Sequence, residues 1–414
     1  MKILITTDWN LTDINGVAIS VSNLFNELIE MGHDVRILTL SKSIHSHKED
    51  HIYYIKSIPF NVYPNVRISV LLFDELFDEI VDWKPDVIHS QCEFFTYTYA
   101  KIIAKRSNAP IVHTYHTMYE DYSEYLKIKK ELGRYIVAFM SKARLRDSTL
   151  VIAPTNKVRN KLKNYDIIQD IKVIPSGIDL SKFNIAVTEK DILEFREKYN
   201  IPENAKILLY LGRLGKEKNI IQLLDYFKQL VKDKDDIVLL LVGGGPFQSE
   251  VENAVKELGL EDKVKMTGMV SPSEVPRFYK YGDIFVSASQ SETQGLTYIE
   301  AMSNGLPQVC KFDECLENVL LDGENGYFFE NGEDFKEKIL EILYNEKLYE
   351  KMSTKALEKS KDFSKEVFAQ SILNSYKLAI TMHRNKPKII DLKADEIWRI
   401  FNFRKYLKRI RRLF

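Results

Sequence analysis

Short apolar runs, rich in β-branched residues, alternate with longer amphipathic segments along most of the chain. One run is Ile3–Thr7; after the turn Asn15-Gly16-Val17 an amphipathic stretch extends from about Ala18 to Met31. Strands that alternate with helices of about 10–15 residues are typical of parallel βαβ units. The pattern predicts further strands at Val35–Leu38, Val87–His89, Pro110–His113, Lys206–Leu211, Ile237–Val242, Val264–Gly268 and Ile284–Ser287.

The pattern restarts after Ile174–Asp179, which we interpret as a connection between two domains. A chain of 414 residues is also too long for one ordinary core. We therefore predict an α/β fold with two doubly wound domains, over 1–174 and 175–370, a helix over 371–388 that returns towards the first domain, and a tail over 389–414. Ligands of such sheets bind at the carboxyl ends of the strands, so two facing domains should form a cleft there.

Composition places the chain among globular proteins, with 45% hydrophobic and 29% charged residues. No apolar run approaches the roughly 20 residues that span a bilayer, and MKILITTDWN reads as a first strand, not a signal peptide. Cys92, Cys310 and Cys315 lack the spacing of a disulfide framework or a zinc site. These features predict a protein of the reducing cytoplasm.

Gly212 to Asn219 lies between a predicted strand and a predicted helix. Helix N-termini attract anions, Arg213 offers a two-pronged donor for phosphate oxygens, and Lys218 offers a point charge. The motif therefore predicts a phosphate site, although a tight turn with solvated basic residues has the same composition.

Ser291 to Met302 is more specific, because two carboxylates flank a helix start. Glu292 precedes the helix and Glu300 lies on its second turn, so each can accept hydrogen bonds from a different part of a polyhydroxylated ligand. Gly295 and Leu296 present backbone N–H groups suited to an anion. An acidic helix start would explain Glu292 but not Glu300.

Three further motifs have ordinary interpretations. Gly243-Gly244-Gly245-Pro246 lacks the full dinucleotide spacing and predicts a loose strand-to-helix turn. His113 and His116, with Glu120 and Asp121 nearby, do not follow a zinc pattern, so we expect hydrogen bonding to a polar substrate. The acidic pair in 233–235 lies where a solvated helix end is expected, and no metal site is predicted.

The formal net charge is zero, yet 399–414 holds seven basic residues and no acidic one. A helix here would carry its apolar residues on one face and its basic residues on the other, which is typical of an interfacial helix on anionic lipid. The membrane-binding residues that we predict are Phe403, Arg404, Lys405, Leu407, Lys408, Arg409, Arg411, Arg412 and Phe414. Packing of this helix on the second domain is the alternative. The basic-apolar stretch 126–146 could extend the same surface.

Together these motifs resemble the retaining glycosyltransferases of family four, which have the GT-B fold of two facing Rossmann-like domains. The resemblance covers Met1 to about Ser375; the His116 loop and the Glu292–Glu300 segment look most like the bacterial diacylglycerol α-glucosyltransferases, which use UDP-glucose. The chain departs from the family in two places. The tail is not part of the family core, and Gln308 stands where the family usually has a small apolar residue. We expect Gln308 to be a local packing change.

The resemblance implies a role for each motif. Arg213 and Lys218 would hold the donor diphosphate, assisted by the backbone near Gly16 and at Gly295 and Leu296. Glu292 would bind the sugar hydroxyls, Glu300 the ribose, and the segment with Gly268 and Met269 the base. His116 would lie near the anomeric carbon and the acceptor. The implied reaction needs no bound metal: the leaving diphosphate takes the acceptor proton on the same face, and Arg213, Lys218, His116 and Glu292 form the catalytic set.

The predicted partners are a nucleotide sugar, a lipid acceptor and an anionic membrane surface, with the protein peripheral on the inner face of the cell membrane. Transfer of galactose or another hexose to a glycolipid or to a cell-wall or protein-linked glycan is an alternative. An inactive GT-B subunit that binds a partner is another, although Arg213, Lys218, Glu292 and Glu300 would then have no use. A nucleic-acid role is not expected, because the basic residues lack stacking aromatics in a recognised fold.

Overall fold

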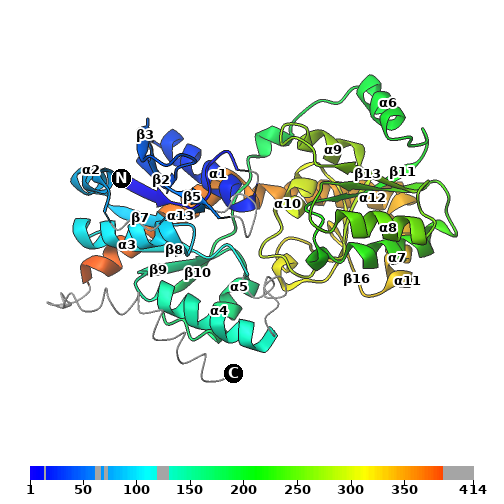
Figure 1. Ribbon diagram of the computed structural model, residues 1–414. Helices are drawn as coiled ribbons and strands as arrows, with labels where there is room; N and C mark the ends of the chain where they lie inside the picture. Colours follow the sequence, from blue (N-terminus) through cyan, green and yellow to red (C-terminus); the bar gives the residue numbers. More distant parts are fainter. Residues whose placement is uncertain (14, 61–66, 70–72, 119–129, 386–414) are drawn as a thin grey trace.

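The computed structural model describes residues 1–13, 15–60, 67–69, 73–118 and 130–385, which form two α/β lobes (Figure 1). The predicted tail 389–414 and the acidic residues 120 and 121 lie outside the described residues. Within the described part, no helix has the length and apolar character needed to cross a bilayer.

The first lobe is built on an eight-stranded sheet of order β10-β9-β8-β7-β1-β2-β4-β3. Its neighbours pair in parallel except β3 with β4. The strands are β1 (Lys2–Thr6), β2 (Asp34–Leu40), β3 (His47–Glu49), β4 (Ile52–Ile55), β7 (Val87–Ser90), β8 (Ile111–Thr114), β9 (Leu150–Ala153) and β10 (Ile171–Val173), with a separate antiparallel pair β5 (Ile58–Pro59) and β6 (Arg67–Ile68). The helices are α1 (Gly16–Glu30), α2 (Glu75–Trp83), α3 (Phe95–Ser107), α4 (Lys130–Leu145) and α5 (Asn156–Asn164).

The second lobe has a six-stranded parallel sheet of order β13-β12-β11-β14-β15-β16. Its strands are β11 (Lys206–Leu211), β12 (Ile237–Val242), β13 (Val264–Gly268), β14 (Ile284–Ser287), β15 (Gln308–Lys311) and β16 (Gly326–Phe329). Its α-helices are α6 (Glu189–Lys198), α7 (Ile220–Val231), α8 (Gln248–Glu257), α9 (Val275–Tyr281), α10 (Leu296–Ser303), α11 (Gly332–Leu343) and α12 (Glu346–Ser360). Short 3-10 turns are η2 (Leu180–Phe183), η3 (Lys216–Lys218), η4 (Glu314–Leu316) and η5 (Lys361–Phe363). The prediction of two doubly wound lobes is confirmed.

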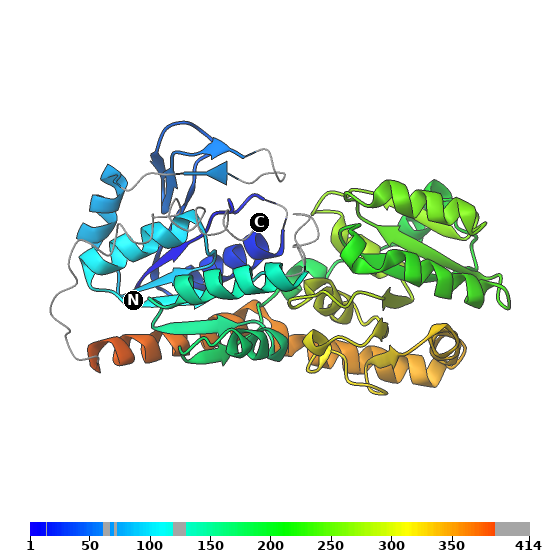
Figure 2. The same cartoon turned by 60° about the horizontal axis from the view of Figure 1, so that its bottom comes forward.

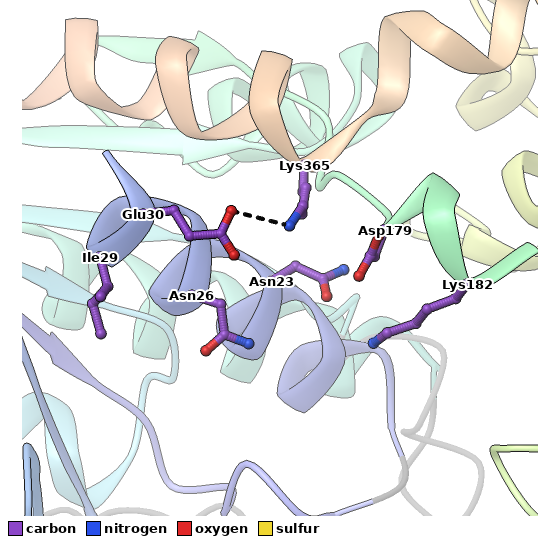
Figure 3. A pocket seen from close by; sticks show the side chains of 7 residues that line it. All are labelled: Asn23, Asn26, Ile29, Glu30, Asp179, Lys182 and Lys365. Atoms are coloured by element: carbon purple, nitrogen blue, oxygen red, sulfur yellow. Dashed lines mark ion pairs between the residues drawn. The ribbon is translucent and has the colours of Figure 1, made fainter. Parts of the chain in front are cut away.

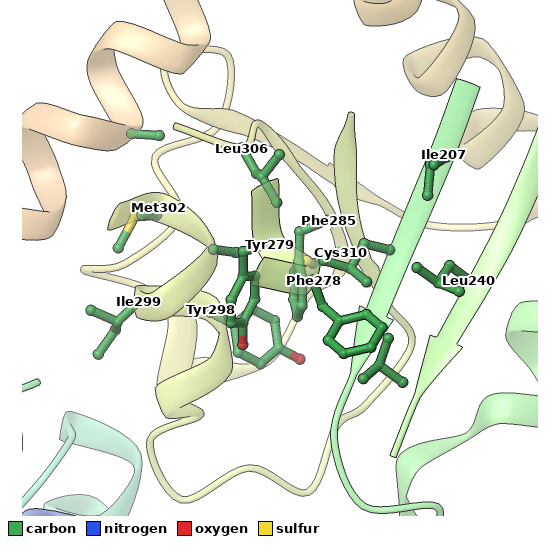
Figure 4. Packing of buried hydrophobic residues seen from close by; sticks show 14 of the residues in the cluster. Ile207, Leu240, Phe278, Tyr279, Phe285, Tyr298, Ile299, Met302, Leu306 and Cys310 are labelled. Atoms are coloured by element: carbon green, nitrogen blue, oxygen red, sulfur yellow. The ribbon is translucent and has the colours of Figure 1, made fainter. Parts of the chain in front are cut away.

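Aromatic packing fixes α10 on the second sheet (Figure 4). Tyr298 is fully buried beside Phe285, with ring centroids 5.3 Å apart, and its hydroxyl donates to Ser287 Oγ at 2.8 Å. Gln308 is also fully buried, and its Nε2 donates to the Tyr298 carbonyl at 2.6 Å. The unusual glutamine is therefore an anchor for the helix that carries Glu300.

The chain returns to the first lobe through α13 (Lys365–Asn385), which lies along that lobe (Figure 2). Phe368, Ile372 and Tyr376 are buried in the first lobe's core with residues of β1 and α1. At the crossing, a Cβ on Gly177 would lie 2.6 Å from the Ser364 carbonyl oxygen, closer than any side chain allows. Glycine therefore lets the two crossing segments pack together.

Beside this crossing lies a hollow of about 280 Å³ whose lining includes several charged side chains (Figure 3). Lys365 Nζ lies 3.3 Å from Glu27 and 3.5 Å from Glu30, both on α1. The hollow is lined by Asn23, Asn26, Ile29, Glu30, Asp179, Lys182 and Lys365. It lies between α1, the start of η2 and the start of α13.

Candidate active site

The loops after β11 and β12 pack so closely that their glycines have no room for a side chain. A Cβ on Gly243 would lie 2.1 Å from the Gly212 oxygen, and one on Gly245 would lie 2.3 Å from the Leu214 oxygen. Leu214 N donates to the Gly244 carbonyl at 3.0 Å. The glycine run, predicted as a loose turn, is instead a close backbone contact that supports the Arg213 loop.

Lys218 and Glu292 meet across 74 residues of sequence. Lys218 Nζ lies 2.6 Å from Glu292 Oε1, to which the Ser289 hydroxyl also donates at 3.0 Å. Burial raises the pKa of Glu292, but the Lys218 ammonium and the Ser289 hydroxyl outweigh it and leave that pKa below its usual value. Arg213 likewise forms an ion pair with Glu217. Both predicted phosphate ligands, Arg213 and Lys218, therefore lie next to carboxylates at the carboxyl ends of the strands of the second sheet.

The backbone between these groups has one local turn that the pattern did not predict. Helix α7 begins at Ile220, and Lys218 lies before it in η3. Asn219, in the left-handed region with φ 52°, separates the two and donates from Nδ2 to the Ala288 carbonyl at 3.2 Å. This bond ties the Lys218 turn to the strand end that precedes Glu292.

Two helix N-termini from different lobes approach each other at the predicted diphosphate position. Gly16 begins α1, and a Cβ built on it would lie 3.7 Å from Leu296 Cδ1 at the start of α10. Asn15 caps α1 by accepting from Ala18 N at 2.9 Å. Gly295, with φ 74°, precedes α10, and its built Cβ would lie 2.6 Å from Tyr298. Both helices direct their positive ends towards this place.

Glu300 lies deeper on α10, where Tyr279 Oη donates to its Oε2 at 2.7 Å. Burial raises the pKa of Glu300. On the other side of the glycine run, Gly268 closes β13 with φ 68°, and its carbonyl accepts from Gly243 N at 3.1 Å. Met269 follows and is 69% exposed. The segment expected to contact the base therefore lies open beside Gly243 and Gly244.

In the first lobe, His116 follows β8 and lies beside Gln91 at the end of β7. His116 Nε2 lies 2.7 Å from Gln91 Oε1, an acceptor, so Nε2 carries the proton and Nδ1 retains a lone pair. Burial and the neighbouring His113 lower the pKa of His116 to about 3. His116 is therefore a neutral imidazole at physiological pH.

Asp8, with one carboxylate oxygen buried, and the buried Glu93 are two acidic residues of this region that the sequence did not single out. Asp8 Oδ1 accepts from Thr96 N at 2.8 Å and so caps α3, while Asp8 Oδ2 is buried without a hydrogen-bond partner. Glu93 Oε1 lies 3.3 Å from His113 Nε2. Asp8 lies two residues after the end of β1, and an acidic residue at a strand end was the available signal.

Asp8→Asn should stabilise the protein at neutral pH by about 2–3 kcal/mol. Burial and, to a smaller extent, Glu93 raise the pKa of Asp8 from 3.8 to about 6. A raised carboxyl pKa contributes stability that is full below 3.8 and is lost as the pH rises through 6. The melting temperature of Asp8→Asn should therefore exceed that of wild type at pH 7, and the difference should shrink at pH 4. Asp50→Asn, an exposed carboxylate of the same lobe, is the control; a pH-independent difference would contradict this account.

Comparison with known proteins gives the family. Residues 14–182 match the family described as Glycosyltransferase Family 4, and residues 191–359 match Glycosyl transferases group 1. The chain is 34% identical to the alpha-monoglucosyldiacylglycerol synthase of Streptococcus pneumoniae, over 84% of this chain and 82% of that protein. It is 28% identical to the synthase of the same name from Acholeplasma laidlawii, over 91% and 96%.

Solved structures agree on the fold. HepE from Anabaena, solved in complex with UDP and glucose, superposes with a TM-score of 0.69 at 16% identity over 91% of this chain and 100% of that chain. Sucrose-phosphate synthase from Thermosynechococcus elongatus gives 0.71 at 20% identity, over 92% and 99%. The chain belongs to family four of the retaining glycosyltransferases and is a hexosyltransferase of the GT-B fold.

Proposed function

We propose that this enzyme transfers glucose from UDP-glucose to 1,2-diacylglycerol, with retention, while bound peripherally to the inner face of the cell membrane. The observation that carries the donor assignment is the approach of the α1 and α10 N-termini beside Lys218 and Glu292. Two positive helix ends and two nearby cations suit a diphosphate. The names of the two relatives above supply the sugar and the lipid.

Each residue takes one role in this proposal. The diphosphate binds between Gly16 and the Gly295–Leu296 backbone and draws Arg213 and Lys218 from their carboxylate partners. Once they have moved to the diphosphate, these cations stabilise the charge that develops on the leaving group. Glu292 holds the sugar hydroxyls, Glu300 the ribose, and the segment with Gly268 and Met269 the base.

The acceptor hydroxyl would enter from the first lobe. His116 is neutral and its Nε2–H is held by Gln91, so the lone pair on its Nδ1 can accept a hydrogen bond from the acceptor hydroxyl. The acceptor proton goes to the departing diphosphate on the same face as the new bond. Retention then needs no second carboxylate at glycosidase spacing.

Helix α4 supports the membrane part of the proposal. Tyr135 is 75% and Phe139 62% exposed, and Ile136 and Met140 are exposed beside them at helical spacing. Exposed basic side chains at Arg134, Lys142 and Arg146 border this apolar strip. We call Tyr135, Ile136, Phe139 and Met140 the α4 strip. An apolar face bordered by basic residues is suited to lie in a lipid headgroup layer.

The test is a donor and acceptor screen with purified protein. UDP-glucose or UDP-galactose is mixed with vesicles of diacylglycerol and anionic phospholipid, and both UDP release and glycolipid are followed. We expect glucosyldiacylglycerol from UDP-glucose alone. Glycolipid formed from UDP-galactose alone would show that the transferred sugar is galactose and not glucose. UDP release without glycolipid would refute the proposed lipid acceptor.

A further inference from the structure

Lys157, on α5 of the first lobe, reaches into the second lobe and binds the loop that carries Glu292. Its Nζ lies 2.8 and 2.7 Å from the two carboxylate oxygens of Asp313. The same ammonium donates to the carbonyls of Gln290 at 3.2 Å and Glu292 at 3.1 Å. Asp313 is almost fully buried, so this is a built contact and not a solvated surface pair.

Two further contacts hold the same loop. Thr155 Oγ1 caps α5 by accepting from Val158 N at 3.4 Å and donates to the Thr293 carbonyl at 3.0 Å. In the segment that joins the lobes, Ser176 exchanges two 2.8 Å hydrogen bonds with the Gln294 side chain. Loop 290–294 is thus bonded to residues of the first lobe and of the connection at four of its five positions.

Energetics favour a positional role for this ion pair. Removing an ammonium and a carboxylate from water costs free energy that offsets most of their electrostatic attraction. Such buried pairs therefore add little net stability to the fold. Asp313 is itself fixed, since its Oδ1 also accepts from Cys315 N at 2.9 Å. The positive charge of Lys157 also acts on Glu292 directly, adding to the larger effect of Lys218.

We propose that Lys157 is a positioning residue of the donor site: it holds loop 290–294 from the opposite lobe, so that Glu292 faces the donor sugar only when the lobes are correctly apposed. The proposal rests on the proposed function in taking a UDP-sugar as donor. Lys157 would touch neither substrate and act through the loop backbone and Asp313.

The test is calorimetric binding of UDP-glucose and of UDP to the full chain. Lys157→Gln should weaken the binding of UDP-glucose about tenfold, the effect of losing one hydrogen bond between the Glu292 carboxylate and a sugar hydroxyl when the loop shifts. UDP should weaken less, because it lacks the sugar that Glu292 holds. Lys157→Arg, which keeps the charge, should recover most of the affinity, and Lys163→Gln, exposed on the same helix, should change nothing. An equal loss for both ligands, or no loss, would overturn the proposal.

A double variant separates the loss of positioning from the loss of folding. If Lys157→Gln unfolds because Asp313 is left unpaired, the double variant Lys157→Met, Asp313→Asn removes both charges and should show the same selective loss. Wild-type affinity for the double variant would refute the proposal. If the wild type binds neither ligand, the donor assignment itself is wrong; if it binds both and the variants match it, only the role of Lys157 fails.

Discussion

Lys218→Gln should lower the rate of sugar transfer about 100- to 1,000-fold, the cost of removing one preorganised charge from a developing anion. Glutamine keeps most of the length of lysine but cannot carry the positive charge that the departing diphosphate needs. Glu292, 2.6 Å away in the wild type, would also lose its ion pair. The measurement is kcat from UDP release with donor and acceptor at saturation.

Two variants separate this chemistry from damage to the fold. Lys216→Gln alters an exposed residue of the same turn and should retain wild-type kcat. Lys218→Gln combined with Glu292→Gln leaves no unpaired carboxylate, so its melting temperature should recover while transfer stays low. If kcat recovers together with stability, Lys218 serves only to balance Glu292, and its assigned role is wrong.

The sequence predicted four of the six strands of the second sheet almost to the residue, and three of these four are buried along most of their length. The strands β11, β12, β13 and β14 begin and end where the apolar runs do. Strands buried on both faces read as continuous apolar runs, and loops with glycine or serine bound them. By contrast, β15 and β16 of the same sheet were not predicted, nor were the two-residue strands β5 and β6, which have no such run.

The site was predictable one residue at a time but not pair by pair. Glu292 and Lys218 could each be placed at a strand end, yet their contact depends on the packing of two loops. Lys157 had no signal at all, because its partner Asp313 lies 156 residues away in the other lobe. Contacts of this kind depend on how the lobes dock, which no local pattern encodes.

Removal of 400–414 should lower partitioning onto anionic vesicles about a thousandfold or more. This segment has six basic residues and no acidic one, and each basic residue contributes about 1 kcal/mol of binding free energy near an anionic surface. Co-sedimentation with vesicles at low salt measures the effect. A truncated enzyme that sediments as well as the full chain would refute the membrane role of this segment.

The α4 strip supplies the contrasting case, because its proposed contribution is apolar. The double variant Tyr135→Ser, Phe139→Ser should bind vesicles more weakly than wild type. This loss should be the same at low and at high salt, because salt does not screen the burial of aromatic surface. Most of the loss caused by truncation should instead disappear near 1 M salt, where the screening length falls to about 3 Å, and only the apolar part from residues such as Phe403, Leu407 and Phe414 should remain. If both losses share one salt dependence, tail and strip do not act as separate contacts. If they differ as expected, charge brings the enzyme to the membrane and the strip holds it there.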